Sequence, residues 1–187
     1  MNARMARDCF ERSPIIAAIR DSEWDVALSS DSEILFLLKA NLMTVAARIE
    51  QAHACGKFVF IHIDLAEGIG KDEIGLAFLA KCGADGIIST RGALLRHAKE
   101  LGMVTVQRFF VLDSQGVQNM EHALNATHPD FIEILPGIAE KIIKRFAGEG
   151  HLLIAGGLLE TKQEVTAALS CGAIAVSTGR QSLWDLA

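Results

Sequence analysis

The sequence has no tyrosine, three prolines and four cysteines in 187 residues. No two cysteines form a CxxC pair, which argues against a zinc site or a disulfide framework. The six histidines contain no His-x-x-x-His pair, so we expect no metal centre. The chain also lacks a run of about 18 uncharged apolar residues, so no membrane span is predicted.

Positive charge is not in excess. The chain carries 18 basic and 23 acidic residues, a net charge of −5, which does not favour nucleic-acid binding through overall charge. Residues 1–13 carry charges, including Arg4, Arg7 and Glu11, where a signal peptide would have an apolar core. We therefore expect a soluble cytoplasmic protein.

Short apolar runs alternate with amphipathic segments along the whole chain, which indicates a parallel sheet built from βα units. No linker divides it, so one domain over residues 1–187 is expected. Thr161 with Glu164 has the spacing of a capping box, and Ser22 and Asp72 are further candidate helix caps. The pattern predicts a compact (β/α)8 TIM barrel, with a doubly wound open sheet as the alternative. The eight predicted strands are 15–19, 34–38, 58–63, 86–89, 104–108, 131–135, 152–155 and 173–177.

The last two predicted strands end in small or hydroxylated residues. In a TIM barrel the loops after strands seven and eight often bind phosphate through backbone N–H groups. Glycine permits close approach of an anion, and a hydroxyl adds a donor. These turns therefore predict a phosphate site, although turning the chain would also explain the glycines. The predicted phosphate-binding residues are Gly156, Gly157, Ser177, Thr178 and Gly179.

Polar residues occur at the ends of the other predicted strands, where the ligand-binding groups of such barrels gather. Carboxylates there would accept hydrogen bonds from substrate hydroxyls or act as acid and base, and arginines would balance a phosphate charge. A polyol phosphate would suit both the carboxylates and the arginines. These residues could instead have purely structural roles. His62 and Asp64 would then hydrogen-bond to each other, and Glu133 would form a salt bridge with Arg20 or Lys39. The predicted hydroxyl or charge contacts are Arg20, His62, Asp64, Gln107 and Glu133, with Thr105 predicted to point inward beside Gln107, and Lys39, Arg91 and Arg108 as further cations.

The glycine-rich segment 67–72 matches neither G-x-G-x-x-G nor the P-loop pattern, which argues against a nucleotide site. Closure over a ligand is one role for this loop, and an inert connection is the other. Two predicted helices carry basic residues, which ordinary solvated helix faces would also explain. These residues are Arg91 and Arg96 on one helix, and Lys141, Lys144 and Arg145 on another.

Taken together, segments along nearly the whole chain resemble the glycerol uptake operon antiterminators. The resemblance implies a TIM barrel that senses glycerol-3-phosphate and acts on the leader mRNA of glycerol-utilisation genes, with no cofactor and no catalysis. The basic residues above are then the candidate RNA patch. Gln115-Gly116 and Gly179-Arg180 depart from the family pattern. The segments are PIIAAIR (14–20), HIDL (62–65) with Glu67, Gly68 and Gly70, DGIIST (85–90), VQR (106–108), DS (113–114), PDFIEILPG (129–137), IAGGL (154–158) and AIAVST (173–178).

The residues alone also permit an enzyme. A barrel with carboxylates, a histidine and a phosphate site has the groups needed for an isomerase, lyase or phosphodiesterase acting on a small phosphorylated polyol or sugar. The family resemblance favours the regulator, as does the lack of a lysine late in strand six, where a Schiff-base aldolase would carry one. The sequence leaves the oligomeric state open, and a homo-oligomer is compatible with it.

Overall fold

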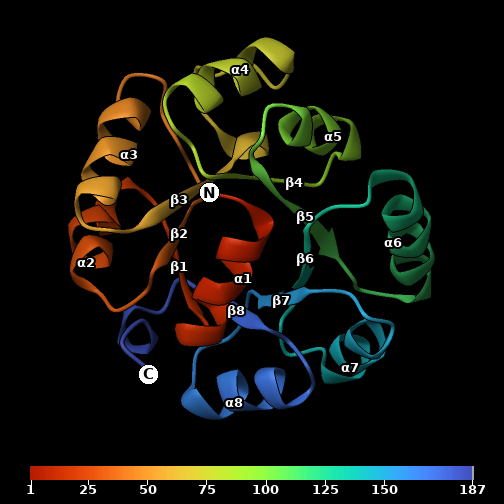
Figure 1. Ribbon diagram of the computed structural model, residues 1–187. Coiled ribbons are helices and arrows are strands. Elements are labelled where there is room, and N and C mark those ends of the chain that lie inside the picture. Colours follow the sequence, from red (N-terminus) through yellow and green to blue (C-terminus); the bar gives the residue numbers. More distant parts are fainter. Residues whose placement is uncertain (187) are drawn as a thin grey trace.

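The computed structural model describes residues 1–186 and forms a closed barrel of parallel strands in the order β1 to β8 (Figure 1). The barrel closes where β1 pairs with β8, with Ile16 opposite Ser177. This closure confirms the predicted (β/α)8 barrel and excludes the open sheet. The strands are β1 Ile15–Ile19, β2 Ile34–Leu37, β3 Phe58–His62, β4 Gly86–Ser89, β5 Val104–Phe110, β6 Phe131–Leu135, β7 Leu153–Gly156 and β8 Ala175–Thr178.

The helices surround the barrel, except α1, which lies across one end (Figure 1). Asp72 and Thr161 cap their helices as predicted, accepting from Gly75 N and Glu164 N. Ser22 is not a cap; the Glu23 carboxylate instead accepts from Arg20 N. No helix within residues 1–186 is long and apolar enough to cross a membrane. The α-helices are α1 Ala3–Arg12, α2 Trp24–Ser29, α3 Val45–Ala54, α4 Glu73–Lys81, α5 Gly92–Glu100, α6 Ser114–Thr127, α7 Glu140–Gly148 and α8 Lys162–Ser170.

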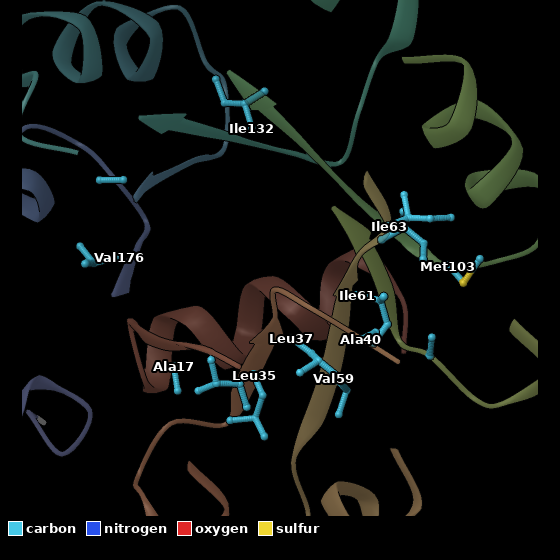
Figure 2. Packing of buried hydrophobic residues seen from close by; sticks show 14 of the residues in the cluster. Ala17, Leu35, Leu37, Ala40, Val59, Ile61, Ile63, Met103, Ile132 and Val176 are labelled. Atoms are coloured by element: carbon cyan, nitrogen blue, oxygen red, sulfur yellow. The ribbon is translucent and has the colours of Figure 1, made fainter. Parts of the chain in front are cut away.

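Two apolar layers stabilise the barrel. Outward-facing residues such as Leu35, Val59 and Ile61 are fully buried against the surrounding helices (Figure 2). Inward-facing residues such as Phe36 and Phe60 fill the interior and stack with ring centroids 5.6 Å apart. Because both faces of the strands are buried, the strands are mostly apolar, and most of their polar residues lie in β5 and β8.

Helix α1 closes the barrel at the N-terminal ends of the strands. Its buried residues Ala6, Cys9 and Phe10 have helical spacing and join the interior core. Phe10 packs edge-on against Phe131, with ring centroids 5.2 Å apart. The barrel interior is therefore covered at this end by an apolar plug.

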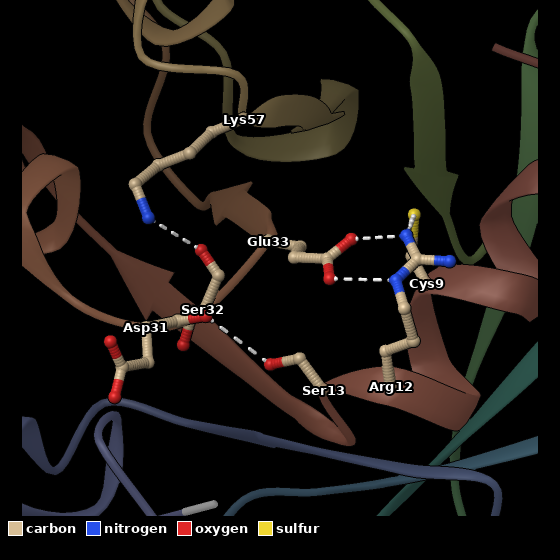
Figure 3. Close-up of polar contacts among 7 residues, drawn as sticks. All are labelled: Cys9, Arg12, Ser13, Asp31, Ser32, Glu33 and Lys57. Atoms are coloured by element: carbon tan, nitrogen blue, oxygen red, sulfur yellow. Dashed lines mark hydrogen bonds and ion pairs between the residues drawn. The ribbon is translucent and has the colours of Figure 1, made fainter.

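Polar contacts fix α1 in place (Figure 3). Arg12 donates to both carboxylate oxygens of Glu33, at 3.1 and 2.6 Å, and this guanidinium lowers the pKa of Glu33. Burial raises the pKa of the Cys9 thiol to about 11, so it is a packed thiol and not a reactive thiolate. Nearby, the Lys57 ammonium donates to the carbonyls of Ser30 and Ser32 at 2.6 and 2.8 Å.

Candidate functional site

A cavity of about 780 Å³ opens at the C-terminal ends of the strands. It is formed by residues at or just after β1, β2, β5, β6, β7 and β8. Seven residues predicted for the ligand site line it, namely Arg20, Arg108, Glu133, Gly157, Ser177, Thr178 and Gly179. The segment from Leu158 to Glu160 and the segment from Arg180 to Ser182 add lining that the prediction did not include.

The floor of the cavity is a buried ion pair. Arg108 Nε donates to Glu133 Oε2 over 2.6 Å, and Ser177 Oγ donates to Glu133 Oε1 over the same distance. Glu133 has no exposed surface. The predicted partners Arg20 and Lys39 are wrong: Arg108 stands opposite Glu133 in the β5–β6 register, while Lys39 pairs with Glu67.

Gly156 has a packing role beside this pair. A Cβ at this position would lie 2.6 Å from Glu133 Oε1 and 2.6 Å from Ser177 Oγ. The glycine thus leaves room for the Ser177–Glu133 hydrogen bond. It does not itself line the cavity, unlike the neighbouring Gly157.

The two hydroxyls of β8 are engaged within the protein. Ser177 donates to Glu133, and Thr178 Oγ1 donates to the carbonyl of Leu159 over 2.8 Å and accepts from Arg180 N. The amides of Gly157 and Gly179, by contrast, have no partner among the loop and cap hydrogen bonds of residues 1–186. Backbone amides, more than hydroxyls, are the donors available to an anion here.

Two exposed arginines stand at the rim. Within the described residues, no carboxylate lies within ion-pairing distance of the Arg20 side chain. Arg180 pairs with Glu160 across the gap between the β7 and β8 loops, at 3.1 Å, and both side chains are more than half exposed. An exposed pair of this kind contributes little stability, so Arg180 can exchange its partner readily.

His62 points into the barrel but does not line the cavity. It is 4% exposed, and within residues 1–186 neither ring nitrogen has a hydrogen-bond partner. Burial, together with the charge of Arg108, lowers the pKa of His62 to about 4. The imidazole is therefore neutral at physiological pH. The expected His62–Asp64 pair is wrong because Asp64 bonds elsewhere.

Asp64 connects β3 to β4. Its carboxylate accepts from Ser89 Oγ, from the amide and hydroxyl of Thr90, and from Arg91 Nε at 3.0 Å. Burial acts to raise the pKa of Asp64, but these hydrogen bonds outweigh it and the pKa is lowered. Asp64 holds this loop and does not line the cavity.

The predicted inward orientation of Thr105 and Gln107 is wrong. Val104 and Val106 join the interior core and Arg108 reaches Glu133, so the alternate residues of β5 face the helices. Thr105 Oγ1 accordingly bonds to Asp130, which precedes β6, at 2.7 Å. Gln107 is buried on the same outer side, away from the cavity.

The glycine-rich loop after β3 is fixed against the loop after β2. Glu67 pairs with Lys39 at 2.7 Å, and its backbone bonds to Ala40 and Leu42. A Cβ on Gly75 would lie 1.8 Å from the carbonyl oxygen of Gly70, so close packing at the start of α4 requires that glycine. These contacts favour a fixed connection over a mobile lid.

The predicted basic patch is not continuous. Arg91 and Arg96 belong to the α5 side, while Lys141, Lys144 and Arg145 lie on α7, with α6 between them (Figure 1). Arg91 is paired with Asp64, and Arg145 is paired with Glu121 and Glu149. Arg96, Lys141 and Lys144 are exposed and have no ion-pair partner among residues 1–186.

The fold and site together define a (β/α)8 barrel with an arginine-lined cavity at its C-terminal mouth. The family model described as glycerol-3-phosphate responsive antiterminator matches residues 15–184. The chain belongs to this family, which confirms the resemblance noted in the sequence.

Individual relatives agree with this assignment. A solved structure titled glycerol uptake operon antiterminator regulatory protein, from Listeria monocytogenes, is 34% identical with a TM-score of 0.87, covering 92% of this chain and 95% of its own. An antiterminator-related protein from Thermotoga maritima is 32% identical with a TM-score of 0.83, covering 93% and 99%. The Escherichia coli protein YgcP, described as uncharacterized, is 34% identical over 94% of each chain. A deoxyribose phosphate aldolase from Aeropyrum pernix, 14% identical with a TM-score of 0.68, shares the fold alone.

Proposed function

We propose that this protein is a cytoplasmic regulator that binds glycerol-3-phosphate and, in response, acts on the leader mRNA of glycerol-utilisation genes so that transcription passes a terminator. The observation that carries the proposal is family membership across residues 15–184. The arginine-lined cavity supports it, because a phosphate ester requires cations and amide donors at one end of its site.

The cavity suits glycerol-3-phosphate in a defined orientation. Its phosphate group would lie at the rim, near the Gly157 and Gly179 amides and the guanidinium groups of Arg20 and Arg180. Its hydroxyls would face the floor formed by Arg108 and Glu133. Binding of a charged phosphate near the surface and of neutral hydroxyls in the interior avoids burying a second charge.

Ligand binding would connect two loops of the barrel mouth. A ligand shifts a conformational equilibrium only when it binds one state better than the other. A phosphate at the rim competes with Glu160 for Arg180, and these two residues belong to the loops after β7 and β8. Exchange of this ion pair is the change we propose as the signal.

The proposed RNA contacts are Arg96, Lys141 and Lys144, which are basic and have no ion-pair partner among residues 1–186. They lie on outer helices, and RNA recognition through them would be electrostatic. Arg91 and Arg145 are weaker candidates than the sequence suggested, since carboxylates already neutralise them.

Thermal unfolding tests whether the protein binds glycerol-3-phosphate. We expect glycerol-3-phosphate to raise the Tm more than inorganic phosphate and far more than glycerol, because only the first occupies both ends of the cavity. Equal indifference to all three compounds would contradict the proposal.

A leader-RNA binding assay with and without glycerol-3-phosphate tests the response. We expect the affinity for RNA to change when the ligand is present, which shows coupling between the two sites. The same preparation, incubated with the ligand alone, is expected to leave it unaltered. Turnover of the compound would instead support the alternative, a TIM-barrel isomerase, lyase or phosphodiesterase.

A further inference from the structure

The cavity has an uneven distribution of charge. Three arginines and three glutamates line it, but they are paired differently at the two ends. At the floor, the charge of Arg108 is balanced by Glu133, and the two side chains are 9% and 0% exposed. At the rim, Arg180 shares an exposed pair with Glu160, Glu23 accepts from the Arg20 backbone amide, and the Arg20 guanidinium has no ion-pair partner within residues 1–186. The guanidinium groups that a ligand can reach without separating a buried ion pair are therefore at the rim.

The floor has no net positive charge for a second anion, because Glu133 neutralises Arg108. The Arg108 Nε already donates to Glu133, and separating this pair would leave the carboxylate buried without its counter-ion. A ligand carboxylate at the floor would also approach Glu133, and like charges repel strongly where water is excluded.

His62 does not supply the missing charge. It lies in the same part of the barrel interior, near enough for its pKa to respond to Arg108 and Glu133. Burial and Arg108 keep the imidazole neutral at physiological pH. His62 also does not line the cavity, so it adds no positive charge to the site.

We propose that Glu133, held by Arg108 and Ser177, is a specificity-determining residue that restricts this site to phosphate esters whose other end is uncharged. Carboxylated phosphate esters and bisphosphates are then excluded by charge and not by size. This inference rests on the proposed function, because it concerns the same cavity and the same class of ligand.

Calorimetric titration of the wild-type protein at neutral pH tests it with three compounds of one carbon skeleton. These are glycerol-3-phosphate, 3-phosphoglycerate, in which a carboxylate replaces the terminal CH2OH, and glyceraldehyde-3-phosphate, in which a neutral aldehyde replaces it. We expect the carboxylate to weaken binding more than about tenfold and the aldehyde to weaken it less. Equal or tighter binding of 3-phosphoglycerate would overturn the inference and leave the proposed function standing. Failure of all three to bind would overturn both.

Glu133→Gln identifies the residue responsible. We expect the preference for glycerol-3-phosphate over 3-phosphoglycerate to fall by about tenfold or more, since Arg108 then becomes free to pair with a ligand carboxylate. The matched control is Glu160→Gln, which removes one negative charge from the rim of the same cavity. It should leave the ratio of the two affinities unchanged. An equal shift of this ratio in both variants would contradict a specific role for Glu133. If Glu133→Gln does not fold, the titrations of the wild-type protein alone test the inference.

Discussion

Arg108 and Glu133 stand opposite each other on β5 and β6, and the 2.6 Å bond between Arg108 Nε and Glu133 Oε2 lies beneath the cavity. This arrangement gives the barrel mouth a rigid floor. A buried ion pair adds little stability compared with apolar residues, yet the loss of one partner is costly because it leaves an isolated charge.

Arg108→Met should therefore lower the free energy of unfolding by about 3–5 kcal/mol. The double variant Arg108→Met with Glu133→Leu should recover most of this loss, because it removes the orphaned carboxylate. Urea unfolding of the wild type and both variants measures the difference. Equal destabilisation in the two variants would show that lost packing, and not the unpaired charge, dominates.

His62 should make stability depend on pH. Its folded-state pKa of about 4 lies below the ordinary value of 6.5, so below pH 6.5 the unfolded chain binds the proton more readily. Stability then falls as the pH decreases from 6.5 towards 4. We expect a contribution of about 2 kcal/mol between about pH 7 and about pH 5. His62→Leu should remove this part of the slope in urea unfolding curves, and an unchanged slope would assign it to other groups.

Gly156→Ala should destabilise the fold by about 1–3 kcal/mol, since its Cβ would meet Glu133 and Ser177. Gly148 at the end of α7 is the matched control, because nothing lies within 4 Å of the position that a Cβ would occupy there. Gly148→Ala is expected to be neutral or to stabilise by about 0.4–1 kcal/mol. Thermal unfolding of both variants compares them, and tolerance of alanine at position 156 would mean that the floor can rearrange.

Lys144→Ala should weaken binding of leader RNA and reduce the slope of log affinity against log salt by up to about 1, as expected for one lost phosphate contact. Arg96→Ala tests the α5 side in the same way. Lys81→Ala on α4 removes an equal charge from another exposed position and should change neither quantity. Filter binding over a salt series measures all three, and identical losses would indicate only a general effect of net charge.

Phe10→Ala should lower the free energy of unfolding by about 3–5 kcal/mol, because Phe10 is 1% exposed and packs against Phe131. Met5 on the same helix is 45% exposed, so Met5→Ala should change stability by less than about 0.5 kcal/mol. Chemical unfolding separates the two. Similar values for both would mean that α1 is held by its polar contacts and not by its apolar face.

The sequence was sufficient for the fold because eight apolar runs alternate with segments of helical periodicity. It was less informative about side-chain direction in β5, where Val104, Thr105, Val106 and Gln107 are all buried. Alternation of polar and apolar residues shows which way side chains point only when one face of the strand is exposed to water. Both faces of β5 are buried, so the orientation of Gln107 could be read only from the folded barrel.

The site was predicted in part. Strand ends located the cavity, but the partner of Glu133 depends on the register between neighbouring strands, which no local pattern specifies. Glu160 and Arg180 likewise meet across two loops. Helix α1 was not predicted, although the sequence contained a signal for it. The spacing of Ala6, Cys9 and Phe10 is helical.

Because α1 covers one end of the barrel, the two ends of the molecule differ. Arg4, Arg7, Asp8 and Glu11 are exposed on the outer side of this helix, while the cavity opens at the far ends of the strands. A fluorophore or surface tether attached to the exposed face of α1 would leave the mouth open to solution. The attachment point and the cavity would then lie at opposite ends of the barrel, which suits the protein to immobilisation for ligand-binding measurements.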